Sequence, residues 1–133
     1  MHREVSFLVN QYIQMHREKG KVNFQMADCT FGGGGHTIKL LQQHTKNLRI
    51  LGTDADLEIV EQGTYAYQDF IKRGKLGLVH SNYVHLPDLN LKKVFRGKVQ
   101  PKPKFDIVLM DLGFSSFQLE DDERGFSYIS DDQ

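Results

Sequence analysis

Four consecutive glycines at residues 32–35 are the residues of this chain whose type and spacing are best suited to chemistry. They separate an apolar run at residues 22–28 from a helical pattern that begins near His36. A glycine loop between a strand and a helix lets a bulky ligand lie against bare backbone, and it tolerates positive φ. The first turn of the helix points unpaired N–H groups back at the loop. The spacing therefore predicts a nucleotide site, with a flexible loop that binds nothing as the alternative.

The order of the glycines does not follow the dinucleotide fingerprint G-x-G-x-x-G. Counted from Gly32 or Gly33, the third glycine position holds Thr37 or Ile38. The chain also shows no recognisable substrate domain for a dehydrogenase. A nicotinamide-dependent oxidoreductase is therefore the weakest of the functions considered.

Aspartates end three of the apolar runs that are expected to form strands. Asp54 follows the glycine loop by about 20 residues, where a carboxylate can accept hydrogen bonds from both ribose hydroxyls. The other role open to Asp54 is to cap the next helix, for which Asp56 is better placed. Asp28 and Asp111 end two further runs, and Tyr83, which could flank a purine or simply pack in its loop, follows another. Ligands of open parallel sheets bind beyond the carboxyl ends of the strands, so these residues are expected to meet at one edge.

Three helices and four strands are expected to position these residues. Apolar residues recur at helical spacing over residues 5–19, 36–44 and 57–73, and apolar or β-branched runs indicate strands at residues 22–28, 47–54, 75–81 and 105–111. The last run is apolar throughout, which is typical of a strand buried on both faces. Residues 86–104 are expected to be the least structured part, and the polar residues 119–133 carry no expected strand. Helices that alternate with strands predict a three-layer α/β/α fold with a mostly parallel sheet.

The composition fits a single domain that covers residues 1–133. The chain has 17 basic and 17 acidic residues, so its net charge gives no argument for nucleic acid. One basic stretch could contact a phosphate backbone but is more often a solvated face; it holds Lys92, Lys93, Arg96, Lys98, Lys102 and Lys104. The only cysteine, Cys29, excludes an internal disulfide. No run is long enough to span a membrane and no signal-peptide core is present, so the expected location is cytoplasmic or organellar, such as mitochondrial, and not secreted.

Four blocks of the sequence, taken in order, resemble the small-subunit ribosomal RNA cytosine-N4 methyltransferase family. They are residues 29–37, 52–56, 79–83 and 111–127. The last block, D-L-G-x-S-S-x-Q-L followed by E-R-G-F-S, is highly specific, and the glycine loop with its trailing histidine is moderately specific. His2 and Val5 also resemble the opening of that family, so the resemblance covers nearly the whole chain.

The resemblance implies a Rossmann-like class I methyltransferase fold that binds S-adenosyl-L-methionine. The matching cofactor-binding positions are Gly34, Gly35, His36, Asp54, Tyr83, Asp111 and Gln118. The loop glycines and their histidine would lie against the methionine part of the cofactor, and Asp54 would hold the ribose hydroxyls. Tyr83 would lie by the adenine, where the family usually has Phe. Asp111 and Gln118 would border both the cofactor and the pocket for the target base.

The reaction that the resemblance implies is N4-methylation of a cytidine in small-subunit ribosomal RNA. The cytosine amino group is a poor nucleophile because its lone pair is delocalised into the ring, so the enzyme must orient it and stabilise the developing positive charge. The candidate catalytic residues are Asp111, Ser115 and Gln118. Asp111, or a backbone carbonyl in residues 112–115, would accept hydrogen bonds from the amino group. The base must be unstacked, and Phe114, Phe117 or Tyr83 would offer it a stacking face.

No metal site is expected, because methyl transfer needs none and the six histidines form no recognisable ligand motif. A C5-cytosine methyltransferase would need a thiolate nucleophile beside the base. Cys29 lies in the glycine loop instead, and it is expected to be a small buried residue.

The chain departs from the family pattern in two respects. Phe114 and Phe117 stand where the family has a small residue and a proline, which reshapes the lip of the base pocket. The chain ends at Gln133, before the inserted helical domain and the last strands of the family. It is therefore expected to bind cofactor but to transfer little methyl by itself, and the alternative function is a non-catalytic module that binds S-adenosylmethionine or a partner. The exposed edges of a four-stranded half-sheet are compatible with a homodimer.

Overall fold

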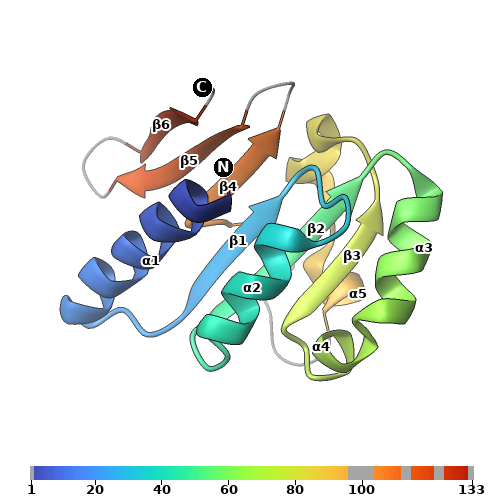
Figure 1. Cartoon of the computed structure of the whole chain (residues 1–133), viewed down its shortest axis with the longest axis horizontal. Coiled ribbons are helices and arrows are strands. Elements are labelled where there is room, and N and C mark those ends of the chain that lie inside the picture. The colour runs from blue at the N-terminus through green and yellow to red at the C-terminus, as the bar shows by residue number, and fades with distance from the viewer. Residues whose placement is uncertain (1, 96–103, 112–114, 122–124, 132–133) are drawn as a thin grey trace.

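The structure is a computed structural model that describes residues 2–95, 104–111, 115–121 and 125–131 (Figure 1). The elements follow one another as α1 (His2–Glu18), β1 (Phe24–Asp28), α2 (Gly35–Gln43), β2 (Leu48–Asp54), α3 (Leu57–Ala66), α4 (Gln68–Lys72), β3 (Leu76–His80), the 3-10 helix η1 (Tyr83–Asp88), α5 (Leu91–Val94), β4 (Ile107–Asp111), β5 (Ser115–Asp121) and β6 (Gly125–Asp131). Strands and helices alternate through β4, as the sequence predicts, and the α/β fold class is confirmed.

The strands form one sheet in the order β3-β2-β1-β4-β5-β6. β1, β2, β3 and β4 run parallel, and β5 and β6 each run antiparallel to their neighbour. The chain moves from β1 outward to β2 and β3, and then returns to lay β4 on the other side of β1. This reversal of strand order next to β1 is the place where open α/β sheets bind ligands, beyond the carboxyl ends of the strands.

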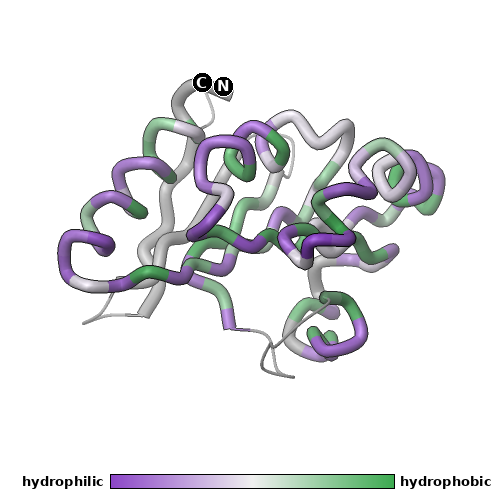
Figure 2. Tube along the Cα trace, turned by 90° about the horizontal axis from the view of Figure 1, so that it is seen from below, coloured by the Kyte–Doolittle hydropathy of each residue, from purple (hydrophilic) through white to green (hydrophobic). Residues whose placement is uncertain are grey.

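The core lies on both faces of the sheet. One cluster joins the apolar stripe of α1, the inner sides of α2 and the α3–α4 segment, and alternate strand residues such as Ile107 and Leu109. A second cluster on the other face joins α5 to the intervening strand residues, of which Val108 is one. Viewed from below, α1, α2 and α3 lie above the sheet and α5 lies under it (Figure 2). The prediction that the fourth strand is buried on both faces is confirmed.

The helix predicted over residues 57–73 is interrupted, which corrects the sequence prediction. α3 ends at Ala66 and α4 begins at Gln68, because Tyr67 leaves the helical conformation with φ −118° and ψ 30°. The Tyr67 hydroxyl reaches back to donate to the carbonyl of Gly33 at 3.0 Å. The helix is therefore interrupted at a residue that contacts the glycine loop, and sequence periodicity does not report that contact.

Two further corrections concern segments for which the sequence predicts little structure. Residues 83–95 contain η1 and the short helix α5, while residues 96–103, with Arg96, Lys98 and Lys102 of the basic stretch, lie outside the described residues. β5 and β6 form an antiparallel pair where the sequence predicts no strand, so the sheet has six strands and not four. β3 and β6 are its edge strands. Dimer formation through such an edge remains a prediction.

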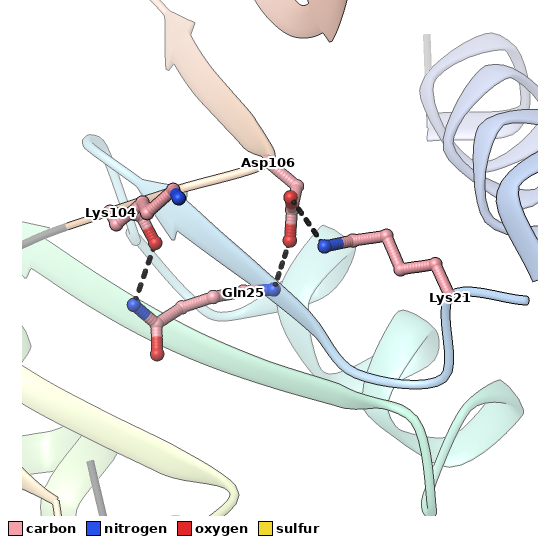
Figure 3. A network of polar contacts seen from close by, with 4 residues as sticks. All are labelled: Lys21, Gln25, Lys104 and Asp106. Carbon is pink, nitrogen blue, oxygen red and sulfur yellow. Dashed lines mark hydrogen bonds and ion pairs between the residues drawn. The ribbon is translucent and has the colours of Figure 1, made fainter. Parts of the chain in front are cut away.

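Asp106 connects the start of β4 to β1, at the end of the sheet away from the glycine loop (Figure 3). One carboxylate oxygen of Asp106 accepts from the backbone N–H of Gln25 at 2.9 Å, and the other pairs with Lys21 Nζ at 3.1 Å. The Asp106 N–H donates to the Gln25 carbonyl at 2.7 Å, and the Gln25 amide donates to the carbonyl of Lys104 at 2.9 Å. These bonds fix where β4 enters the sheet and, through it, where the carboxyl end of β4 lies.

Replacing Asp106 with alanine is expected to destabilise the fold by about 1–3 kcal/mol, because the Gln25 N–H then has no acceptor in a partly buried position. Lys21→Ala keeps the backbone hydrogen bond but removes the ion pair, whose lysine side chain is 39% exposed, and the contact of Lys21 Nζ with the Phe24 ring at 5.4 Å from its centroid; it is expected to cost about 1 kcal/mol or less. Urea unfolding of both variants measures the difference. Equal losses would mean that the ion pair, and not the backbone hydrogen bond, accounts for the role of Asp106.

Candidate functional site

The carboxyl ends of the four parallel strands meet at one edge of the sheet, as the sequence predicts. In the strand register Asp28 lies opposite Gly52 of β2 and Leu109 of β4, and Asp54 lies opposite His80 of β3. Asp111 ends β4 two residues further along. The glycine loop rises from this edge between β1 and α2 (Figure 1). The edge therefore brings together elements that are far apart in the sequence.

The glycine loop adopts the positive φ that the sequence predicts. Gly32 has φ +57° and Gly34 has φ +85°, and Gly34 is the N-cap of α2. The carbonyl of Gly34 accepts from Ile38 N at 2.9 Å, which is the first hydrogen bond of the helix. Gly33 and Gly35 are exposed. The loop thus presents bare backbone and the start of a helix to solvent, which suits an anionic or nucleotide ligand.

Phe31 accounts for three of the glycines in this part of the chain. A Cβ atom at Gly34 would lie 2.9 Å from Phe31 Cζ, one at Gly52 would lie 2.7 Å from Phe31 Cδ1, and one at Gly63 would lie 3.0 Å from Phe31 Cε2. The ring is buried between the loop, β2 and α3. From the sequence, Gly34 is assigned to the cofactor and no contact is predicted for Gly52 or Gly63. Their missing side chains make room for the loop's own aromatic ring and, at Gly52 and Gly63, also for Leu78.

The carboxylate of Asp54 joins the end of β2 to the glycine loop. Its Oδ2 accepts from Gly32 N at 3.0 Å and its Oδ1 accepts from Asp56 N at 3.0 Å. The helix cap is Asp56, whose side chain accepts from Glu58 N at 2.9 Å. Asp56 as the cap of the following helix is confirmed. Each carboxylate oxygen can accept more than one hydrogen bond, so Asp54 can hold the loop and still bind a ligand hydroxyl.

Asp28 ties the two ends of the loop together from inside. Its Oδ2 accepts from the Thr37 hydroxyl at 2.6 Å, and its Oδ1 accepts from Thr30 N at 3.3 Å. Asp28 is 1% exposed and Thr37 is fully buried. Asp28 therefore supports the loop from behind. Sequence reasoning missed Thr37, although a threonine in the first turn after a glycine loop is a signal that could have suggested such a contact.

Tyr67 supports the loop from the other side. Its ring meets the Phe31 ring edge-on, with the centroids 6.2 Å apart, and its hydroxyl holds Gly33. A cavity of about 200 Å³ lies between the loop and α3; it is lined by Gly32, Gly33, Ile59, Gln62, Gly63, Ala66 and Tyr67. Gly32 and Gly33 of the predicted glycine loop line it, but none of the cofactor-binding or catalytic residues that the resemblance implies does. Binding sites for cofactor-sized ligands are usually larger than this, about 300–1,000 Å³.

For the remaining predicted residues, the position of the backbone shows where they lie relative to the loop and the strands. Gly35 and His36 begin α2 beside the loop, and His36 is half-buried. Tyr83 begins η1, three residues after β3. These positions lie beside the loop and beyond the end of β3, where the sequence predicts cofactor contacts.

Asp111, Ser115 and Gln118 fall at different depths in the sheet. Asp111 pairs with Ser115 at the start of β5, so these two backbones are adjacent at the carboxyl edge. Gln118 pairs with Val108, which is three residues back along β4 and so about 10 Å from the edge. Phe114 lies outside the described residues. The roles of Asp111, Ser115 and Gln118 remain predictions.

Cys29 is buried at the start of the loop, as the sequence predicts. Burial, and to a smaller extent the neighbouring Asp28 carboxylate, raises the pKa of the Cys29 thiol from 9.0 to about 12. A thiol held in its neutral form is a poor nucleophile. The position and the raised pKa both indicate a packing role for Cys29.

The native chain is expected to resist alkylation of Cys29. A pKa rise from 9.0 to about 12 lowers the thiolate fraction at pH 8 by about a thousandfold. Iodoacetamide labelling at pH 8, followed by mass spectrometry, should be at least a hundredfold slower in buffer than in urea. The unfolded chain loses this proton first as the pH rises, so Cys29 should lower stability only above about pH 9. Equally fast labelling in both conditions would contradict a buried thiol.

Two absences hold for the part of the chain that the structure describes. No group of three or more His, Cys, Asp or Glu side chains there is arranged to hold a metal ion. No helix among those residues is both long and apolar enough to cross a bilayer.

Comparison with known proteins identifies similar sequences. A model of the MraW methylase family matches residues 1–133. Three relatives are each named ribosomal RNA small subunit methyltransferase H. The relative from Oenococcus oeni is 38% identical over 84% of this chain and 33% of the relative, and the one from Caldicellulosiruptor saccharolyticus is 40% identical over 78% of this chain and 31% of the relative. The relative from Clostridium botulinum is 33% identical over 78% of this chain and 30% of the relative. The chain spans about a third of the length of these relatives.

Proposed function

Because this chain belongs to the MraW methylase family, we propose that it is the cofactor-binding part of a ribosomal RNA methyltransferase. The methyl donor is S-adenosylmethionine, and the acceptor is the N4 amino group of a cytidine in small-subunit ribosomal RNA. The observation that carries the proposal is the contact of Asp54 with the glycine loop at the carboxyl edge of a parallel sheet. That edge is where folds of this type bind nucleotides.

The residues present fit S-adenosylmethionine. Gly33 and Gly35 leave exposed backbone, and the N-terminal N–H groups of α2 suit the carboxylate of the methionine part. Asp54 is half-buried and keeps lone pairs that can accept from the ribose hydroxyls. When bound, the cofactor supplies an electrophilic methyl group on a sulfonium.

The residues at the end of β4 would handle the target base. Asp111 and Ser115 lie opposite each other in the antiparallel β4–β5 pair, at the same edge as Asp54. Acceptors at this place would orient the cytosine amino group and stabilise the positive charge that develops on its nitrogen. Gln118 pairs with Val108 about 10 Å back from this edge, so its role in the pocket is supported by the resemblance and not by the strand register. The base itself must leave its stack to reach this edge.

Nucleoside analysis of small-subunit ribosomal RNA tests this function. Deleting the gene that encodes this chain should remove one N4-methylated cytidine, and the unaltered gene should restore it. Complementation with Asp111→Ala should fail, whereas Lys39→Ala, an exposed residue on the outer side of α2, should succeed. Loss of a 5-methylcytidine instead, or no loss at all, would reject the proposal. Tight S-adenosylmethionine binding with no change in the RNA would favour the alternative of a non-catalytic binding module.

A further inference from the structure

Lysines lie at the start of every parallel strand, at the edge of the sheet opposite the candidate site. Lys21 precedes β1, Lys46 precedes β2, Lys75 precedes β3 and Lys104 precedes β4, each by no more than three residues. Because the four strands are parallel, these starts share one edge, the lower one in Figure 1. The sequence shows these lysines only as scattered single charges.

Backbone contacts show that these segments are neighbours in space. The carbonyl of Asn47 accepts from Phe24 N at 2.7 Å, which joins the start of β2 to the start of β1. The carbonyl of Lys75 accepts from Ile50 N at 2.9 Å, which joins β3 to β2. The carbonyl of Lys104 accepts from a β1 side-chain amide at 2.9 Å. With strands about 4.8 Å apart, the four starts extend over about 14 Å.

Two helices end at the same edge and add four more cations. Arg17 and Lys19 lie on either side of Glu18, the last residue of α1, and Lys72 and Arg73 lie at the end of α4. Cations in a last helical turn also complement the helix dipole, which accounts for Arg17 and Lys72. It does not account for the lysines of the strand connections. Figure 2 looks directly onto this edge, with hydrophilic segments toward the viewer.

The opposite edge has the reverse character. Residues 22–38, 50–71 and 76–91, which include the glycine loop and the carboxyl ends of β1, β2 and β3, contain no lysine or arginine. Asp54, Asp56 and Glu58 lie there instead. Over β1, β2 and β3 the cations therefore gather at one end of the sheet, whereas Glu120 and Asp121 at the end of β5 add negative charge to that same edge beyond β4.

We call this surface the basic edge. It consists of seven cations that form no ion pair among the described residues: Arg17, Lys19, Lys46, Lys72, Arg73, Lys75 and Lys104. All but the half-buried Lys75 are exposed. Lys21 is excluded because it pairs with Asp106. Unpaired exposed cations gathered on one surface repel one another, and a polyanion that binds there relieves that repulsion.

We propose that the basic edge binds the phosphate backbone of RNA. The choice of RNA rests on the proposed function. Flexible lysine side chains contact phosphates without reading bases, so the surface would hold the RNA and leave selection of the base to the opposite edge. Each neutralised phosphate releases counterions, so binding must weaken steeply with salt.

Fluorescence anisotropy with a labelled 30-nucleotide fragment of small-subunit ribosomal RNA, at several salt concentrations, tests this inference. The double variant Lys46→Glu with Lys104→Glu should bind at least about tenfold more weakly than the unaltered chain, and its salt slope should fall by about two. The single variant Lys39→Glu, at an exposed position in the middle of α2, makes the same change in net charge as the single variant Lys46→Glu. Lys39→Glu should stay within about twofold of the unaltered chain, and Lys46→Glu should bind more weakly.

Equal losses in Lys39→Glu and Lys46→Glu would overturn the inference, because net charge alone would then account for binding. No RNA binding by the unaltered chain, or equally tight binding to a polyglutamate peptide or to phosphatidylserine vesicles, would also overturn it. A parallel titration with S-adenosylmethionine separates the two proposals. If the chain binds RNA through Lys46 and Lys104 but does not bind S-adenosylmethionine, the inference about the basic edge is supported and the proposed function is rejected.

Discussion

Replacing Gly34 with alanine should destabilise the chain by about 2–5 kcal/mol and weaken S-adenosylmethionine binding by at least about thirtyfold. Gly34 has φ +85°, where a residue with a Cβ costs about 1–2 kcal/mol. The new Cβ would lie 2.9 Å from Phe31 Cζ and 3.0 Å from Tyr67 Cε2. Both rings are held in place, so crowding adds about 1–3 kcal/mol and displaces the loop.

Gly33→Ala is the matched control for this prediction. Gly33 is exposed, its φ is not positive, and a Cβ there meets nothing within 4 Å. It should change stability by less than about 1 kcal/mol, whereas any loss of affinity would come from the new methyl group at the exposed loop surface. Urea unfolding and calorimetric titration of both variants measure the two effects. If alanine is tolerated equally well at both positions, Phe31 does not set the shape of the loop.

Asp54→Ala should abolish measurable cofactor binding, a loss of about a hundredfold or more. The variant removes the acceptor of Gly32 N and the predicted acceptor of the ribose hydroxyls at the same time. Asp56→Ala is the control, because it removes the α3 cap at a cost of about 1 kcal/mol but leaves the loop contact in place. Calorimetric titration should show that only the first variant fails to bind.

A cofactor analogue separates the two roles of Asp54. If the carboxylate binds the ribose, S-adenosylmethionine without its ribose 2′-hydroxyl should bind the unaltered chain more weakly, by about tenfold or more. Asp54→Asn, which keeps one acceptor oxygen, should discriminate less between the two compounds. If Asp54 only holds the loop, the unaltered chain should bind S-adenosylmethionine and the analogue with the same affinity.

Local features of this fold can be predicted from the sequence. The positive φ in the glycine loop, the Asp56 cap and the buried fourth strand each depend on a few neighbouring residues. The meeting of strand ends at one edge follows from the parallel α/β pattern alone. These predictions are confirmed because short-range propensity and the known behaviour of parallel sheets agree here.

Features that depend on distant residues are those that the sequence does not reveal. The site of Phe31 is made by Gly52 and Gly63, which lie in different elements, so no local window shows why these glycines are needed. The break at Tyr67 has the same origin, since its partner Gly33 is far away in the sequence. The support of Asp28 by Thr37 spans the whole loop.

The β5–β6 pair was missed for a different reason. The resemblance directs attention to Ser115 and Gln118 as site residues, and the acidic residues near Asp121 in the sequence favour an unstructured segment over a strand. The period-two pattern in Phe117 and Leu119 is the signal that could have found the first strand.

The most direct test of the central claim is an NMR titration of the isotopically labelled chain with S-adenosylmethionine, followed through its backbone amides. The account predicts large shifts at the glycine loop, at Asp54, at Tyr83 and at the end of β4 near Asp111, with little change at the starts of the strands. Shifts confined to the cavity between Gly33 and α3, or no shifts in a folded chain at millimolar cofactor, would contradict a cofactor site across the carboxyl edge of the sheet.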